Sequence, residues 1–118
     1  MSSDSPVAVA ETAQFASASR KLFDETEREE LTDFLAWNPL VGDVIAGTGG
    51  IRKLRWALKG RGKSGGARVI YYYHDERIPL YLLDVYAKND QANLSLAARN
   101  DFKKLTAALA AIAKERRS

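Results

Sequence analysis

The first third of the chain has hydrophobic positions at helical spacing. Acidic residues crowd the first turn after Asp24, which suits the positive end of a helix dipole, and Asp24 is itself a good N-cap. Pro39 ends the pattern, because the residue before a proline avoids the helical conformation. Residues 24–37 are therefore predicted to be a helix, and a weaker pattern predicts another over residues 11–22. The apolar side chains of the stronger helix are Leu31, Phe34, Leu35 and Trp37.

Runs of β-branched and aromatic residues in the second half predict strands over residues 51–58, 67–74 and 79–86. A glycine-rich loop, KGRGKSGG, joins the first two, and the turn DERI joins the second pair, so the three form an antiparallel meander. Residues 7–10 are a further candidate strand, and residues 44–46 a short extended piece. Residues 95 to about 115 have an apolar side at helical spacing, which predicts a C-terminal helix.

These elements predict an α+β fold of one domain, residues 1–118, with residues 1–6 disordered. The expected architecture is a small antiparallel sheet, the meander plus the candidate N-terminal strand, packed against an N-terminal helical hairpin and a C-terminal helix. We expect the helices on one face of that sheet. Trp37 and Trp56 are expected in the core.

The composition excludes several classes of protein. The chain has no cysteine and one histidine, so disulfides, thiolate metal sites and histidine-rich metal sites are not expected. The P-loop-like run at residues 62–64 lacks the first glycine of that motif, and GTGG lacks dinucleotide spacing, so no cofactor is expected. We find neither an apolar run of membrane-spanning length nor a signal peptide. The expected location is the cytoplasm, with no membrane partner.

Positive charge is concentrated in the middle of the chain. Residues 1–49 contain three Lys or Arg against nine Asp or Glu, whereas residues 51–74 contain seven cations and no acid. Such a concentration attracts phosphate, so a polyanion is the first partner to consider. The seven cations are Arg52, Lys53, Arg55, Lys59, Arg61, Lys63 and Arg68.

Strand alternation sorts some of these cations onto one surface. If Leu54 faces the core, then Lys53 and Arg55 share the open face. Arg68 begins the next strand and is long enough to reach the same groove, and Lys88 closes it from another side. Whether Arg68 itself faces the groove depends on a register that the sequence leaves open.

Fixed cations of this kind stabilise the negative charge that develops when an RNA phosphodiester is cut. The attacking group is then the 2′-hydroxyl of the RNA, and Lys53 is the candidate general base. The alternative is a solvated strand face on which Lys and Arg only discourage strand pairing.

Three segments, GTGGIRKLR, GGARVIYYY and YAKN, lie within residues 42–90. Together they make the chain resemble the HigB-like branch of the RelE/ParE superfamily of type II toxins. The resemblance implies a small α+β mRNA interferase, an endoribonuclease that enters the ribosomal A site and cuts the message there. It also implies an antitoxin partner, usually of helix-turn-helix type, and a reaction that needs no metal.

By position, the resemblance assigns the catalytic roles to Lys53, Arg55, Arg68 and Lys88. The C-terminal tyrosine of the family has no counterpart in residues 94–100, which leaves the acid and base open. Six further residues are candidates for contact with RNA or the ribosome, although loop cations are also commonly only solvated, and tyrosines often pack in the core. They are Arg52, Lys59, Arg61, Lys63, Tyr72 and His74.

Two other functions remain open at this stage. One is inhibition of DNA gyrase, as in the ParE-type branch, and the other is nucleic-acid binding without catalysis. The cations Lys53, Arg55 and Arg68 favour the endoribonuclease over both.

Overall fold

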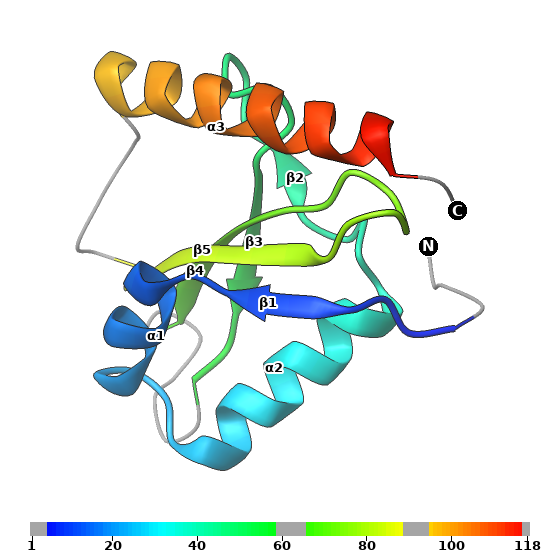
Figure 1. Cartoon of the computed structure of the whole chain (residues 1–118). Coiled ribbons are helices and arrows are strands. Elements are labelled where there is room, and N and C mark those ends of the chain that lie inside the picture. The colour runs from blue at the N-terminus through cyan, green and yellow to red at the C-terminus, as the bar shows by residue number, and fades with distance from the viewer. Residues whose placement is uncertain (1–4, 59–65, 89–94, 117–118) are drawn as a thin grey trace.

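Five strands form one sheet in the order β1-β5-β4-β3-β2, with helices on both sides of it (Figure 1). The computed structural model describes residues 5–58, 66–88 and 95–116. The predicted strands and helices are all present there, together with the two-residue strand β2, so the α+β class is confirmed. The elements are β1 (Val9–Glu11), α1 (Ala13–Arg20), α2 (Glu25–Trp37), β2 (Asp43–Val44), β3 (Arg52–Trp56), β4 (Ala67–Tyr72), β5 (Leu80–Ala87) and α3 (Leu96–Glu115).

Each helix begins at a side chain that caps it. Asp24 accepts a hydrogen bond from the backbone N–H of Glu27 at 2.8 Å, and the Glu27 carboxylate accepts from the backbone N–H of Asp24, which completes a capping box. Thr12 caps α1 and Ser95 caps α3, and each side chain accepts one hydrogen bond from the backbone N–H three residues further along. These side chains bind backbone donors that the first helical turn leaves unpaired, so the helix starts are fixed locally.

The sheet is mixed, whereas the sequence predicted an antiparallel one. β2, β3, β4 and β5 pair antiparallel in chain order, but β1 lies parallel to β5 at the far edge. The backbone N–H of Leu80 donates to the Ala8 carbonyl at 2.8 Å, and that of Thr12 to the Leu82 carbonyl at 3.0 Å. The first and last strands of the chain therefore become neighbours, a long-range pairing that no local pattern specifies.

The helices cover both faces of the sheet, and the prediction that they share one face is wrong. Val69 and Tyr71 of β4 pack with the α1 and α2 side chains, whereas Ile70 and Tyr72 pack with α3. Figure 1 shows α3 above the sheet and α1 and α2 below it. The central strand β4 is consequently buried on both faces, which explains its almost continuous apolar sequence.

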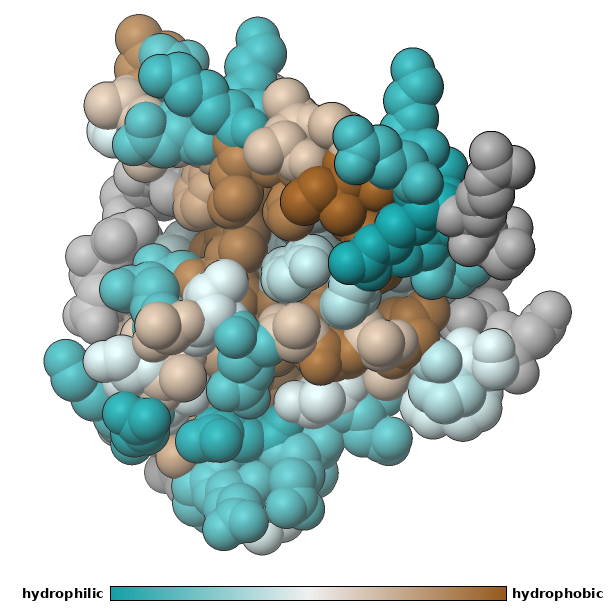
Figure 2. Space-filling view, viewed as in Figure 1, coloured by the Kyte–Doolittle hydropathy of each residue, from teal (hydrophilic) through white to brown (hydrophobic). Residues whose placement is uncertain are grey.

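The surface reflects this layering. Figure 2 shows hydrophilic side chains over the outside of α2 and a hydrophobic band between α3 and the sheet. Trp37 is 40% exposed at the end of α2, so its predicted place in the core is wrong, while Trp56 is half-buried and packs at 5.4 Å from the ring of Phe34.

α3 docks onto the loop that precedes β3. The Thr106 hydroxyl donates to the Thr48 carbonyl at 3.1 Å, and both side chains are buried. Gly49 has φ of +78°, and a Cβ there would collide with the Thr106 hydroxyl. Glycine therefore permits both the backbone conformation and the close approach of the helix. This contact determines how far α3 lies from the sheet. We call the face of the sheet that α3 covers the α3 face.

Candidate active site

Arg55, Arg68 and Tyr86 form a row across three neighbouring strands. Arg55 of β3 lies directly opposite Arg68 of β4, and Arg68 lies directly opposite Tyr86 of β5. Residues that pair directly project from the same face of a sheet, and their Cβ atoms are about 4.5–5.5 Å apart. The register thus settles what the sequence left open: Arg68 shares the α3 face with Arg55.

Two further cations adjoin this row. Lys53 pairs with Ile70, so it projects from the same face two residues before Arg55, and it is half-buried. The backbone N–H of Lys88 donates to the Gly66 carbonyl at 3.0 Å, which places this exposed lysine just beyond the end of β5. We call these four residues the basic surface: Lys53, Arg55, Arg68 and Lys88.

No ion pair joins the basic surface to a carboxylate in the described residues, although Asp43 of β2 lies directly opposite Lys53. Arg68 donates only a long hydrogen bond, 3.4 Å, to the Ala67 carbonyl, and no ion pair joins any of the four cations to an acid there. Like charges directly opposite each other on neighbouring strands destabilise a sheet. An anion between Arg55 and Arg68 would relieve that repulsion, so the arrangement suits phosphate.

Arg52 lies apart from this surface. It pairs with Tyr71 and so projects from the face that α1 and α2 cover. Its guanidinium donates to the carbonyls of Leu40 and Gly42 at 3.1 and 2.7 Å. These bonds hold the segment before β2 against β3. Arg52 therefore has a structural role that does not depend on contact with RNA.

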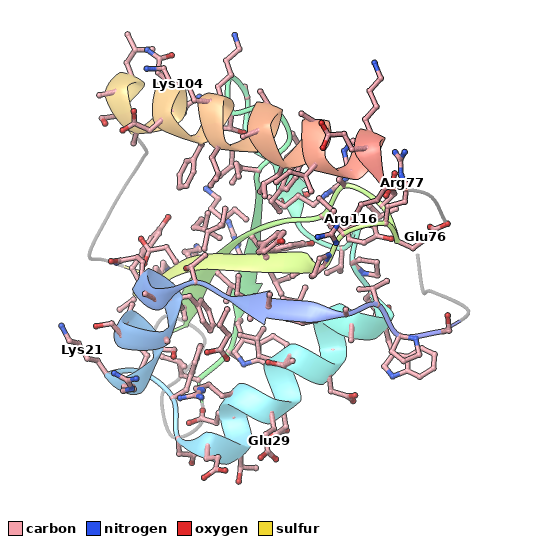
Figure 3. The ribbon with its side chains drawn as sticks, in the orientation of Figure 1. Lys21, Glu29, Glu76, Arg77, Lys104 and Arg116 are labelled. Carbon is pink, nitrogen blue, oxygen red and sulfur yellow. The ribbon has the colours of Figure 1, made fainter. Side chains whose placement is uncertain are left out.

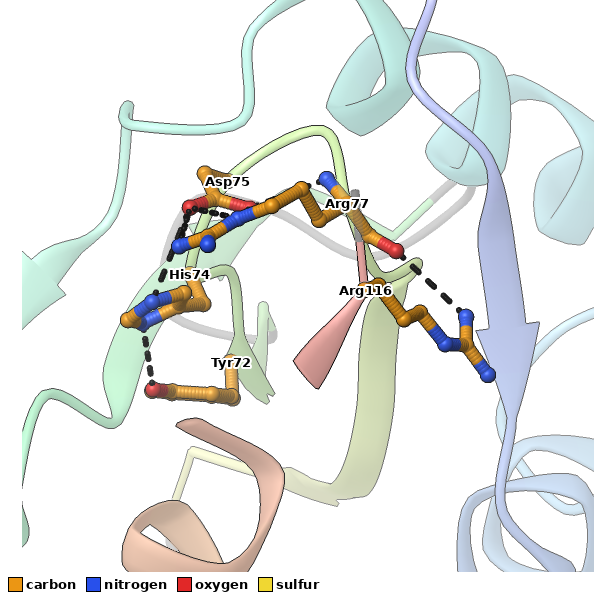
Figure 4. Close-up of polar contacts among 5 residues, drawn as sticks. All are labelled: Tyr72, His74, Asp75, Arg77 and Arg116. Carbon is orange, nitrogen blue, oxygen red and sulfur yellow. Dashed lines mark hydrogen bonds and ion pairs between the residues drawn. The ribbon is translucent and has the colours of Figure 1, made fainter. Parts of the chain in front are cut away.

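Tyr72 and His74 belong to a polar chain at the other end of β4 (Figure 4). The Tyr72 hydroxyl hydrogen-bonds to Nδ1 of His74 at 3.2 Å, and Nε2 of His74 lies 3.6 Å from Asp75. Tyr72 is only 4% exposed, so its ring has no face open to a base, contrary to the sequence-based expectation. Hydrogen bonds from the Arg77 side chain and backbone lower the pKa of Asp75 to about 2.

His74 is remote from the basic surface along the sheet. Arg68 is at the start of β4, and His74 lies two residues beyond its last residue. Figure 3 shows Arg77 and Arg116 at the end of the sheet where α3 finishes, and Arg116 donates to the Arg77 carbonyl at 3.4 Å. The structure thus separates His74 from the four catalytic candidates.

The remaining loop candidates, Lys59, Arg61 and Lys63, lie outside the described residues, as do residues 1–4. In the described segments, no group of three His, Asp or Glu side chains is arranged to hold a metal ion. The same segments contain no helix that is long and apolar enough to cross a membrane.

Tyr86 is the residue of the row that the sequence analysis missed. It was counted only as the end of a predicted strand, because its partner depends on the β4–β5 register. A β-bulge near Ile70 shifts that register, so Tyr71 pairs with Leu82 but Arg68 with Tyr86. Counting from the hairpin turn alone therefore misplaces the partner of Arg68.

The basic segment and the elements around it also match a known family. Residues 42–117 match the family model described as the RelE toxin of the RelE/RelB toxin-antitoxin system. The chain belongs to the RelE toxin family. It is thus a toxin of the type II toxin-antitoxin class, and a cognate antitoxin is implied as its partner. RelE toxins are in general endoribonucleases, and the match spans β2 to α3, including the whole basic surface.

Proposed function

We propose that this RelE family toxin is a ribosome-dependent endoribonuclease that cuts mRNA in the ribosomal A site. The observation that supports this most strongly is the direct pairing of Arg55 with Arg68, with Lys53 beside them and no ion pair from either arginine to a carboxylate in the described residues. Arginine forks bind two phosphate oxygens at once, which suits them to a phosphodiester.

The 2′-hydroxyl of the message attacks the adjacent phosphorus. The amine of Lys53 accepts the hydroxyl proton or stabilises the developing charge, and Arg55 and Arg68 clamp the non-bridging oxygens of the phosphorane. Lys88, just beyond the end of β5, adds positive charge toward the neighbouring phosphate. The products are a 2′,3′-cyclic phosphate and a free 5′-hydroxyl, with no metal ion required.

The ribosome supplies the positioning that this toxin lacks. Arg55 is exposed, and the cleft of about 460 Å³ beside Lys53 and Arg55 is lined partly by the short strand β2. Such a shallow site does not hold flexible RNA in a reactive geometry by itself, and orientation contributes much of the rate in enzymes. We therefore propose that free RNA is a poor substrate.

We further propose that the toxin is of the HigB-like type and that its antitoxin has a helix-turn-helix domain. To neutralise the toxin, that antitoxin must cover or distort the basic surface. Coverage of Arg55 and Arg68 requires acidic side chains on the antitoxin, because complementary charge fixes the register of such a contact.

The test is primer extension on cellular messages after brief induction of the toxin without antitoxin. Wild type should produce new in-frame breaks in translated regions, and Arg68→Ala should abolish them. Lys114→Ala is the control: it also removes one cation, an exposed one at the far end of α3. Growth arrest without breaks in the messages would contradict the proposal and would favour inhibition of DNA gyrase. Unimpaired growth would contradict the proposal that the protein is toxic.

A further inference from the structure

Three aromatic rings surround a pocket at the end of α2. Phe34 and Trp37 are exposed on the last turn of the helix, and Trp56 of β3 is half-buried beside them. The Phe34 and Trp56 rings are tilted by 51° to each other, with their centroids 5.4 Å apart. The pocket has a volume of about 400 Å³. We call it the aromatic pocket; its lining residues are Glu30, Asp33, Phe34, Trp37, Asn38 and Trp56.

Negative charge surrounds the aromatic pocket. Glu30 and Asp33 bring two carboxylates to its lining, and no ion pair in the described residues involves Asp33. Asn38 ends the helix here, because its backbone N–H and its side-chain amide both donate to the Phe34 carbonyl at 2.9 Å. A helix C-terminus carries partial negative charge that favours cations, and the last turn of α2 contains no basic residue. The carboxylates and the helix end therefore give the pocket a negative potential.

Aromatic faces and carboxylates together select a cation. The face of an aromatic ring attracts a cation that lies within about 6 Å of its centre, and tryptophan does so most strongly. An arginine side chain suits this lining best. Its planar guanidinium stacks on rings, binds a carboxylate through two N–H groups, and is less strongly hydrated than the ammonium group of lysine.

The same charges disfavour RNA as the occupant. A nucleic acid would bring its phosphates close to Glu30 and Asp33, and like charges repel at that range. The basic surface has the opposite preference, so the two sites require different chemical groups. A protein with both acidic and basic side chains can satisfy both of them.

An exposed apolar strip connects the two sites. Leu40, Val41 and Val44 follow the aromatic pocket along the chain, and all three are exposed. Val41 and Val44 also line the cleft that contains Lys53 and Arg55 of the basic surface. Exposed apolar residues that adjoin one another mark surfaces for protein contact. A protein that covers the basic surface and extends along this strip therefore reaches the aromatic pocket.

We propose that the aromatic pocket receives an arginine side chain of the cognate antitoxin. The inference rests on the coverage of the basic surface that the proposed function assigns to the antitoxin. Acidic side chains of the antitoxin then lie on the basic surface, apolar ones lie on the strip, and the arginine stacks between Trp37 and Phe34. Opposite charges at the two ends of the interface allow only one direction of the antitoxin chain across the toxin.

The first test measures the affinity of the purified toxin for its purified antitoxin. Trp37→Leu should weaken binding by about 10-fold or more, because a tryptophan that stacks on an arginine is typical of the residues that dominate an interface. Asp33→Asn keeps the shape of the pocket and should weaken binding by about threefold or more. Glu29→Gln is the matched control for charge, because Glu29 is an exposed acid of α2 outside the pocket lining. Wild-type affinity in both folded pocket variants would overturn the proposal.

A double-mutant cycle identifies the arginine. Each arginine of the antitoxin is replaced by glutamine, and the variants are titrated against wild-type and Trp37→Leu toxin. One replacement should weaken binding to the wild type by about 10-fold and have little further effect on Trp37→Leu, since residues in contact have non-additive effects. Additive effects for every arginine would contradict the assignment.

Further measurements separate this inference from the proposed function. Trp37 and Asp33 lie outside the basic surface, so their variants should cut ribosome-bound message at the wild-type rate. Slow cleavage by these variants with unchanged antitoxin affinity would place the pocket against the ribosome and overturn the proposal. If Arg55→Gln leaves antitoxin affinity unchanged, the proposed coverage of the basic surface is wrong, whereas a coupled arginine at Trp37 still supports the pocket. An intact message with wild-type toxin contradicts the endoribonuclease function alone.

Discussion

Arg55 and Arg68 lie directly opposite each other on β3 and β4 and project from the same face of the sheet. No acid of the described chain pairs with either, so two positive charges remain close together without compensation. Strand neighbours of like charge cost stability, and a protein that retains such a pair favours binding over stability. The pairing of Arg55 with Arg68 should therefore affect the stability of the fold as well as the binding of RNA.

Arg55→Gln should make the toxin more stable while weakening it as a nuclease. Removal of the like-charge contact should raise the free energy of unfolding by about 0.2–1 kcal/mol at low salt. In about 1 M salt the gain should shrink, because screening acts over roughly 3 Å there. Urea denaturation at both salt concentrations measures it. Lys114→Gln, which also removes one exposed cation, should give no gain; a loss of stability in Arg55→Gln would contradict the account.

Tyr71→Phe should loosen the segment that leads into β2. The buried Tyr71 hydroxyl accepts from the backbone N–H of Gly42 at 2.8 Å and donates to the Pro39 carbonyl at 2.9 Å. Without it, two buried backbone groups lose their partner, and we expect a loss of about 1–3 kcal/mol in the free energy of unfolding. Thermal or urea unfolding measures the loss. Tyr73→Phe is the control, and equal effects of the two substitutions would rule out this role.

Gly49→Ala should destabilise the docking of α3 more than Gly47→Ala does. Both glycines have positive φ, +78° and +76°, so both substitutions strain the backbone. Only at position 49 does the new Cβ also collide, with the hydroxyl of Thr106; at position 47 the nearest atom is 3.9 Å away. We expect about 1–3 kcal/mol from the strain in each and an additional loss at position 49. Equal losses would show that the close approach is unimportant.

The Asp75 carboxyl should titrate with a midpoint of about pH 2, below its usual 3.8. Because its pKa is lowered in the folded state, its contribution to stability is present above about pH 4 and is lost as the pH falls toward 2. Arg77→Gln removes the guanidinium hydrogen bonds, the largest cause of the lowered pKa, and keeps the backbone hydrogen bond, so the midpoint should move part of the way back toward 3.8. Carboxyl carbon NMR between pH 2 and 6 measures both midpoints; a wild-type midpoint near 3.8 would disprove the contact in solution.

Local chemistry predicted much of this structure. The cap at Asp24, the stop at Pro39 and the DERI turn determine element ends through neighbouring residues only, and each is confirmed, whereas most of the run KGRGKSGG lies outside the described residues. Alternation in β3 also separated Arg52 from Lys53 and Arg55 correctly, because it depends only on the pleat of one strand.

Features that depend on distant pairings were not predictable in the same way. The parallel pairing of β1 with β5 joins segments about 70 residues apart in the sequence. The position of α3 on the opposite face of the sheet depends on the order of the layers, which no local pattern determines. In the candidate active site, the pairing of Arg68 with Tyr86 could not be predicted, because it depends on the β-bulge near Ile70. The almost continuous apolar run of β4 was an indication in the sequence that both faces are covered.

The most direct test of the central claim is cleavage by purified toxin in a reconstituted system. A defined message is offered either free or bound in the A site of ribosomes, and the new 3′ ends are analysed for a 2′,3′-cyclic phosphate. The account predicts cleavage of the ribosome-bound message, much slower cleavage of free message, and a loss of about 100- to 1,000-fold in Arg68→Ala but none in Lys114→Ala. An intact ribosome-bound message at saturating wild-type toxin, or equal cleavage by wild type and Arg68→Ala, would contradict it.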